Sequence, residues 1–388
     1  ATFESGESSF DVENLPPLVL GGIYAMADVL REEILESVSQ AMEDGIKVVM
    51  ITGDHFGTAK ALAKQAGIFA EGDTVITGSE IDGLSIEELS KKLENVSVFA
   101  RVLPDHKLSI IEAYKLRGDV IGMTGDGVND ALSLQSAHLG ISMGRGGTEV
   151  AKEASDIVLL DNNFKSIIAA IEEGRSIYST IKKVVLYLIS TSIGEFLSIA
   201  VAISLGFPLP LFPSQILWLN LVTDGFFVVA LAFEPNVSMK ENRRKIDNTE
   251  IISRKSLLRA FLLGFTMMLG TLIMFYFAYS AGNYKVWTLS LTVLVVFQWF
   301  NAWNCRSSKD SAFYKMFSNK YLVLGLLGST LLHIFALYTP FMNKVLNVVP
   351  LNKTDWVIVI MIASSILLVE ELRKFINNLR NRHLQRVA

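Results

Sequence analysis

The pattern of apolar and polar residues changes near residue 180 of this 388-residue chain. Before that point, short apolar runs alternate with stretches in which apolar residues recur at helical spacing, and this predicts strands alternating with helices. After it, apolar runs of about 20 residues follow one another, the length that an α-helix needs to cross a bilayer. The pattern therefore predicts a soluble α/β portion followed by a helical membrane portion.

The soluble portion is expected to contain strands at residues 18–26, 46–51, 96–101 and 120–123. Helices are expected at residues 30–43 and 57–65, and from Pro104 onward. Gly45 and Gly67 follow the first two helices and mark their ends. Strands that alternate with helices favour a parallel sheet, which binds ligands beyond the carboxyl ends of its strands.

The sequence TGDGVND, residues 124–130, directly follows the last of these strands. Its glycines allow the backbone to approach a bound anion, and Asp126 and Asp130 offer carboxylate oxygens of the kind that bind Mg²⁺ together with phosphate and water. A turn rich in Asp and Asn is the alternative interpretation of so short a motif. Thr52, however, ends another strand with a hydroxyl, and Lys107 lies at the start of a helix, where anions bind. Together these residues favour a phosphate and Mg²⁺ site.

Composition supports the membrane portion and narrows the function. Apolar residues make up 51% of the chain, and the mean hydropathy of +0.39 is high for a soluble enzyme. The formal net charge of −4 argues against a nucleic-acid partner. Cys305 is the single cysteine, which excludes an intrachain disulfide and gives no zinc site. Residues 1–14 are polar and acidic, unlike a signal peptide.

Four segments resemble the P-type cation-transporting ATPases, whose phosphorylation domain has the haloacid-dehalogenase fold. The segments are VVMITGDHFGTAKALAKQAGI (48–68), FARVLPDHKLSIIE (99–112), MTGDGVNDALSLQSAHLGISMG (123–144) and EVAKEASDIVLLDNNF (149–164). The resemblance extends over nearly the whole chain. It implies an α/β haloacid-dehalogenase-like phosphorylation domain, with a Rossmann-type parallel sheet, followed by an all-α transmembrane bundle of six spans.

The resemblance also implies roles for individual residues. Those expected to bind phosphate or nucleotide are Thr52, Gly53, Asp54, Arg101, Lys107 and Asn129. Those expected to hold Mg²⁺ are Asp126 and Asp130, and the expected catalytic group is Thr52, Lys107 and Asp126. ATP is the expected substrate and Mg²⁺ the expected cofactor, because phosphoryl transfer depends mainly on positioning and charge neutralisation.

One motif of the family is missing. The phosphorylated aspartate of these pumps lies in a DKTGT sequence, which does not occur in these 388 residues. The chain therefore resembles the C-terminal half of a pump: residues 1–20 as the tail of a nucleotide-binding domain or a linker, 21–178 as part of the phosphorylation domain, and 179–388 as six membrane helices. Its expected partners are membrane lipid and an N-terminal half that carries the actuator domain, the nucleophile and the first four spans. The isolated chain is expected to be inactive, and a non-catalytic membrane subunit or fragment is the alternative.

Six crossings are expected, at residues 184–205, 210–233, 257–281, 286–305, 321–341 and 356–372. The segments after the second, fourth and sixth are basic, with Lys240, Arg243, Arg244 and Lys245, then Arg306, Lys309 and Lys315, then Arg373, Lys374, Arg380, Arg382 and Arg386. The loops between them are poorer in Lys and Arg. This asymmetry predicts a multi-pass membrane protein whose soluble portion and ends face the cytoplasm.

Two expected crossings contain a carboxylate, Glu195 in the first and Asp224 in the second. A charged side chain at the membrane centre costs at least about 2.5 kcal/mol, so such residues are functional candidates, although protonated acids that only join helices are the alternative. Asn220 and Asp224 are four residues apart and share one helix face with Thr223 nearby. These oxygen ligands suit a hard cation and argue against copper or zinc.

The sequence NLVTDG, residues 220–225, resembles the calcium-type pumps. In that branch, the members that carry two ions have Asn in the first of these spans and a carboxylate in the fourth. The matching residues here are Ser192 and Gln298, both neutral. The resemblance therefore implies one Ca²⁺ per cycle with Asn220 and Asp224 as the main ligands, and a pump for Na⁺, Mn²⁺ or protons is the alternative.

Overall fold

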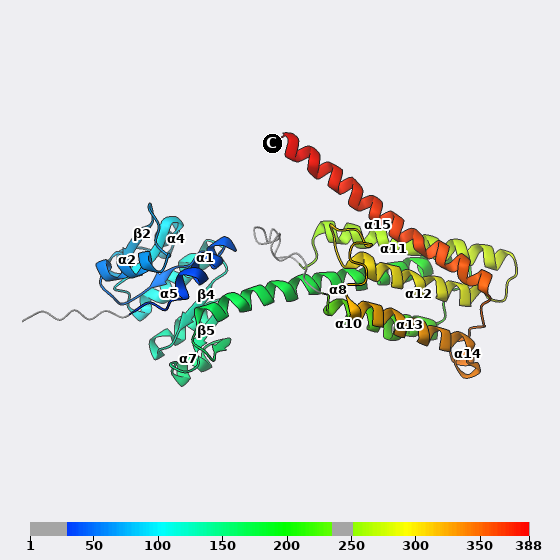
Figure 1. Ribbon diagram of the computed structural model, residues 1–388, viewed down its shortest axis with the longest axis horizontal. Coiled ribbons are helices and arrows are strands. Elements are labelled where there is room, and N and C mark those ends of the chain that lie inside the picture. Colours follow the sequence, from blue (N-terminus) through cyan, green and yellow to red (C-terminus); the bar gives the residue numbers. More distant parts are fainter. Residues whose placement is uncertain (1–28, 235–250, 388) are drawn as a thin grey trace, which may run out of the picture. The chain divides into compact units, whose positions relative to one another are not determined.

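The computed structural model describes residues 29–234 and 251–387, with side chains placed up to residue 380 (Figure 1). The chain divides into two compact units, one ending at Ala169 and the other beginning at Ala170. The expected strand at residues 18–26, the expected segment 1–20 and the basic run at residues 240–245 lie outside the described residues. The expected domain boundaries at residues 20 and 178 remain predictions.

The first unit contains two parallel sheets of three strands each. One has the order β1 (Met50–Ile51), β3 (Val96–Ala100), β2 (Thr74–Thr77). The other has the order β4 (Gly122–Gly125), β5 (Leu139–Met143), β6 (Ile157–Leu159). All the pairings within them are parallel, so the α/β parallel architecture expected from the sequence is confirmed.

Short helices connect and cover the strands of the first unit. They are α1 (Ile34–Glu43), α2 (Phe56–Gln65), α3 (Gly78–Ile81), α4 (Ile86–Lys92), α5 (Pro104–Leu116), α6 (Ala131–Ser136) and α7 (Glu149–Glu153). Every residue of β3 is buried. Phe99 packs in the cluster that includes residues of α4 and α5, whereas Val98 and Ala100 pack against Ala59 and Ala63 of α2. This arrangement follows from the alternation of side chains along a strand.

Two expected strands differ from the observed ones. The strand expected at residues 46–51 is reduced to β1, and the side chain of Lys47, which precedes it, donates to the carbonyls of Leu93 and Glu94 at 2.7 Å each. The strand expected at residues 120–123 begins two residues later, at Gly122. Val120 is exposed, and the Ile121 N–H donates to His138 Nδ1 at 3.2 Å.

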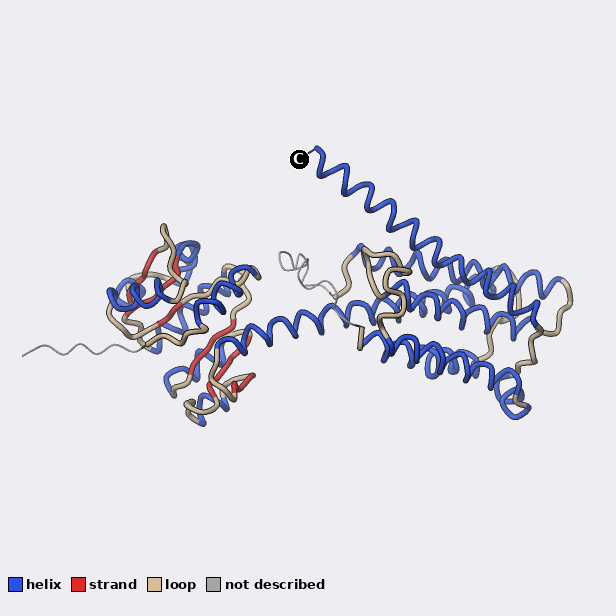
Figure 2. The backbone as a smooth tube through the Cα atoms, in the orientation of Figure 1, coloured by secondary structure: helices blue, strands red, loops and turns tan. Residues whose placement is uncertain are grey.

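Within the described residues the second unit is built from helices alone (Figure 2). They are α8 (Phe164–Ser204), which begins in the first unit, α9 (Pro213–Trp218), the π-helical turn η3 (Leu219–Thr223), α10 (Asp224–Ala232), α11 (Arg254–Ser280), α12 (Val286–Cys305), α13 (Lys320–Tyr338), α14 (Pro340–Leu346) and α15 (Lys353–Val387). Helix α12 is the most enclosed, because it packs against α10, α11 and α15 (Figure 1).

Five of the expected crossings coincide with helices long and apolar enough to span a membrane. Within the described residues these are α8, α9–α10, α11, α12 and α13. The sixth, at residues 356–372, lies inside α15 but is not one of the five, and it remains a prediction. Glu370 of α15 is fully buried and pairs with Arg259 of α11 at 2.6 Å, so this acid faces the bundle and not its surface.

Candidate functional sites

The end of β1 is joined to the end of β3 through a short polar turn. Thr52 Oγ1 donates to Asp54 Oδ2 at 2.8 Å and accepts the Asp54 N–H at 3.1 Å. The Arg101 N–H donates to the Asp54 carbonyl at 3.0 Å. Gly53 and Asp54 are exposed. The structure therefore brings together four of the residues expected to bind phosphate or nucleotide.

Arg101 has a backbone conformation that is uncommon for a residue with a side chain. It follows β3 with φ of 51°, in the left-handed region. The loop after it is fixed by the buried His106, whose Nδ1 accepts the Leu103 N–H at 3.2 Å and whose Nε2 lies 2.8 Å from Asp82 Oδ1. Strained residues collect at functional sites, and Arg101 is exposed and bonded through its backbone to the Asp54 turn. Sequence reasoning missed His106.

Asp130 shapes the loop that follows β4. Its Oδ1 accepts from Lys107 Nζ at 2.5 Å, and its Oδ2 accepts the N–H groups of Asp126 and Gly127 at 3.3 Å each. A Cβ on Gly125 would come 2.5 Å from Asp130 Cβ, so only glycine allows this approach. Both oxygens of Asp130 are engaged and the residue is buried. In this arrangement Asp130 positions Lys107 and the loop.

Asp126 presents the more available carboxylate. It is exposed, as is Asn129 in the short helix η2 (Val128–Asp130), and its side chain forms no hydrogen bond in the described part of the chain. Mg²⁺ commonly binds one or two protein carboxylates and completes its shell with phosphate and water, so Asp126 fits such an ion. Among residues 29–234 and 251–387 there is no group of three or more His, Cys, Asp or Glu that could hold a metal alone.

One small core is shared by the turn at Thr52 and Asp54 and by the loop that carries Asp126 and Asp130. Met123 of β4 belongs to a buried cluster with Ile111 of α5, and Ile51 of β1 packs against the same cluster. Because Thr52 follows Ile51 and the TGDGVND loop follows Met123, both groups lie where these strands end. The ends of parallel strands are where α/β sheets bind ligands.

A second candidate site lies inside the helical unit, around Asp224. The π-helical turn η3 separates α9 from α10 and places Asp224 as the first residue of α10. Asp224 is 2% exposed. Its Oδ1 accepts from Tyr187 Oη at 2.8 Å and its Oδ2 from Thr191 Oγ1 at 3.3 Å, both on α8. Single π-helical turns are often found at functional sites.

Glu195 is held by two amides. Its Oε2 accepts from Asn220 Nδ2 at 3.0 Å and its Oε1 from Gln298 Nε2 at 3.2 Å. Gln298 in turn accepts from Thr223 Oγ1 at 2.5 Å. The structure therefore connects Glu195, Asn220, Thr223 and Gln298 in one network, as sequence spacing alone could not show, with Asp224 directly following Thr223 in the chain.

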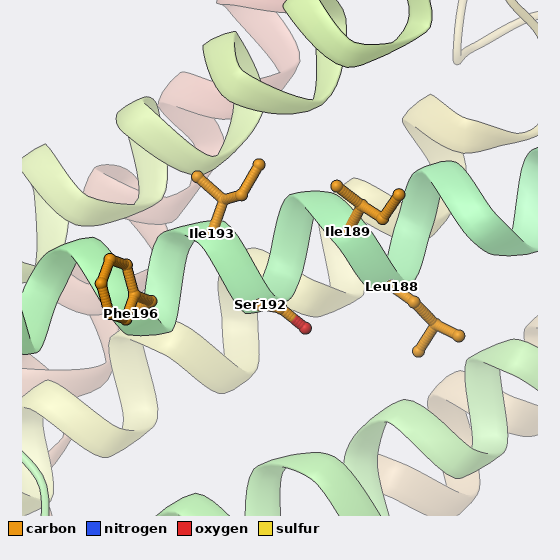
Figure 3. A pocket seen from close by; sticks show the side chains of 5 residues that line it. All are labelled: Leu188, Ile189, Ser192, Ile193 and Phe196. Carbon is orange, nitrogen blue, oxygen red and sulfur yellow. The ribbon is translucent and has the colours of Figure 1, made fainter. Parts of the chain in front are cut away.

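Ser192 is the one expected ion ligand that is exposed and belongs neither to this network nor to the group around Asp224. Its side chain is exposed and lines an apolar pocket on α8 together with Leu188, Ile189, Ile193 and Phe196. Figure 3 shows its hydroxyl pointing away from the side of α8 on which Ile189 and Ile193 lie. Glu195 lies three residues further on and is buried, so the two side chains lie in different environments.

Sequence reasoning missed Tyr187 and Thr191. Both are almost fully buried, and they precede Glu195 by eight and four residues, which places all three on one face of α8. This spacing of polar side chains within an apolar helix was the signal that could have identified them. All four donors to the Glu195 and Asp224 oxygens in the described residues are neutral. Two buried carboxylates without a cationic partner suit a bound cation or proton.

Comparison with known proteins identifies both units. Residues 5–138 match the family described as haloacid dehalogenase-like hydrolase, and residues 208–376 match the family described as cation transporting ATPase, C-terminus. The first match agrees with the parallel sheets of the first unit, and the second with the membrane-type helices of the second unit.

Curated relatives cover most of the chain. It is similar to a calcium-transporting ATPase of Bacillus subtilis (strain 168), with 38% identity over 361 residues. It is also similar to a probable cation-transporting ATPase F of Mycobacterium bovis, with 38% identity over 368 residues, and to the endoplasmic reticulum calcium ATPase srcA of Aspergillus fumigatus, with 36% identity over 398 residues. Each comparison covers 92% of this chain but only 41% of the relative's length.

Proposed function

Because the chain belongs to the P-type cation-transporting ATPases, matching the C-terminal portion of the calcium-transporting members, we propose that it works within a longer pump that hydrolyses ATP to move Ca²⁺ across a membrane. The observation that carries this proposal is the buried pair of carboxylates, Glu195 and Asp224, surrounded by neutral oxygen-bearing side chains. The names of the relatives support Ca²⁺ as the transported ion.

The first unit supplies groups for phosphoryl transfer. Lys107, held in place by Asp130, contacts the phosphoryl group as a positive charge. The Thr52 hydroxyl, which donates to Asp54 in this structure, would turn to donate to a phosphoryl oxygen when phosphate is bound. Arg101, Gly53, Asp54 and Asn129 line the adjoining phosphate and nucleotide site. Mg²⁺, held by the exposed Asp126, neutralises charge on the phosphate oxygens when it is bound, which is a main part of catalysis in such reactions.

The phosphorylated aspartate comes from outside these 388 residues, since no DKTGT sequence occurs in them. Support for an added segment comes from the sheets, because in the described part of the chain β1 and β4 each pair with one neighbour only. Both strands end at the proposed phosphate site. We therefore expect the aspartate-bearing segment to extend the sheet at one of these edges, where its aspartate would approach Thr52, Lys107 and Asp126.

The second unit supplies the transported-ion site. Asp224 and Asn220 are the principal ligands, and Glu195, Thr223 and Gln298 contribute further oxygens. We place one Ca²⁺ here per cycle, because Ser192 and Gln298 are neutral and Ser192 lies outside the network. The basic residues of the loop after α12 and of α15 favour a cytoplasmic position for the ends and the soluble unit.

The proposal is tested on the full-length pump in vesicles. ATP hydrolysis should be stimulated by micromolar Ca²⁺, and Ca²⁺ should accumulate on one side, because oxygen ligands of this charge suit that ion. Na⁺, Mn²⁺ and a pH step, each applied without Ca²⁺, are the comparison conditions. If Na⁺, Mn²⁺ or the pH step stimulates ATP hydrolysis and Ca²⁺ does not, the transported ion is not Ca²⁺ but the ion that stimulates. A complete lack of ATP hydrolysis would favour a non-catalytic membrane subunit.

A further inference from the structure

Four donors hold the two buried carboxylates of the ion network, and they are of two chemical kinds. Asp224 accepts from the hydroxyls of Tyr187 and Thr191, both on α8. Glu195 accepts from the amides of Asn220 in η3 and Gln298 in α12. Amides and hydroxyls respond differently when a cation binds the carboxylates.

An amide must turn before it can bind a cation, because it presents N–H groups to a carboxylate and its carbonyl oxygen to a metal. Asn220 and Gln298 therefore have to reorient when an ion is bound between the carboxylates. A hydroxyl does not have this constraint, since each carboxylate oxygen can accept a second interaction while the O–H continues to donate. The α8 side of the network can stay as it is while the η3 and α12 side changes.

Tyr187 is fully buried and closely packed. The residue is 0% exposed, and its ring packs against Phe227 of α10 with a centroid distance of 6.1 Å. Its backbone carbonyl accepts from Ser190 Oγ at 2.8 Å, and Ser190 accepts from Asn301 of α12 at 2.8 Å. Among the described residues, Asp224 is the only hydrogen-bond partner of the Tyr187 hydroxyl. A buried Tyr hydroxyl that lost this acceptor would be left unsatisfied, which is costly.

We propose that Tyr187 is a positioning residue for the ion site: it holds the Asp224 carboxylate in the orientation that receives the cation. Thr191 assists from one turn further along α8 through a longer contact, 3.3 Å against 2.8 Å. This inference rests on the proposed ion-transport function and adds to it a residue outside the expected ligand set. The Tyr187 O–H donates to Asp224, and in this proposal it acts through that carboxylate and is not itself an ion ligand.

The experiment compares Tyr187→Phe with wild type in the full-length pump. The substitution removes only the hydroxyl and keeps the ring against Phe227, so folding should be retained. The Ca²⁺ concentration for half-maximal ATPase activity should rise about tenfold or more, the size expected for one hydrogen bond to a charged group. The maximal rate at saturating Ca²⁺ should stay within about twofold, because the phosphoryl-transfer residues are untouched. Thr191→Val should cause a smaller rise.

Tyr338→Phe is the control, because it removes the same phenol hydroxyl from an exposed tyrosine. It removes a hydroxyl on α13 that donates to the Leu351 carbonyl at 2.6 Å, away from Glu195 and Asp224. Half-maximal Ca²⁺ should be unchanged in this variant. The proposal is overturned if Tyr187→Phe leaves the Ca²⁺ concentration for half-maximal ATPase activity unchanged. It is also overturned if the substitution lowers only the maximal rate and the thermal midpoint. If wild type shows no Ca²⁺ dependence at all, the proposed function fails and this inference falls with it.

Discussion

At the scale of single residues, Asp126 and Asp130 show how two similar carboxylates acquire different roles. Both lie in the TGDGVND loop, and the sequence predicts both as Mg²⁺ ligands. In the structure Asp130 is buried and both its oxygens are engaged by Lys107 and the loop backbone, whereas Asp126 is exposed. This geometry favours Asp126 as the direct ligand and Asp130 as the residue that positions Lys107.

Asp126→Asn in the full-length pump should therefore lower the Mg²⁺-dependent phosphoenzyme by about 100-fold or more, since charge neutralisation at the phosphate is a main catalytic term. Phosphoenzyme formed from labelled ATP is the measurement. Asp119→Asn serves as the control, because Asp119 is paired with Arg117 on the surface. If the Asp126→Asn pump forms phosphoenzyme at the wild-type level, Asp126 is not a ligand of the catalytic Mg²⁺.

At the scale of elements, apolar patterning predicted the five long apolar helices and, in part, the strands β1, β3 and β4, because both periodicities are set by burial, but it did not predict β2, β5 and β6. Apolar patterning did not predict irregular turns within helices or contacts between distant segments. The π-helical turn η3 carries Asn220 and ends just before Asp224, and the two residues bond different side chains of α8: Asn220 bonds Glu195, and Asp224 bonds Tyr187 and Thr191. Contacts between distant segments, such as Thr223 with Gln298, depend on packing that no local pattern encodes.

Helix α15 also shows that apolar patterning does not reveal which charged residues are buried. Its sequence carries acids that lower its apolar character, yet Glu370 is buried against Arg259. Glu370→Gln should destabilise the helical unit by about 3–5 kcal/mol, because it leaves the buried Arg259 guanidinium without the carboxylate that balances its charge. The thermal midpoint in detergent is the measurement. The double variant Arg259→Met/Glu370→Met should recover most of the loss, and an equal loss in both variants would show that packing, not charge, is responsible.

At the scale of the whole molecule, the chain spans 41% of the length of the calcium-transporting relatives described above, and we infer that its two candidate sites work within a longer pump. The phosphate site has Lys107 and Asp126 but no aspartate in the DKTGT context. The ion site has two carboxylates, Glu195 and Asp224, in the described residues. The central claim is that this ion site holds one Ca²⁺.

Charge decides that number. Two Ca²⁺ would bring four positive charges against the two carboxylates Glu195 and Asp224, and a buried surplus of charge is unfavourable. Equilibrium binding of ⁴⁵Ca²⁺ to the full-length pump tests the claim most directly. Binding should saturate near one ion per pump and be lost in Asp224→Asn, whereas Glu195→Gln should weaken it less. Saturation at two ions per pump, or full binding in Asp224→Asn, would contradict the account.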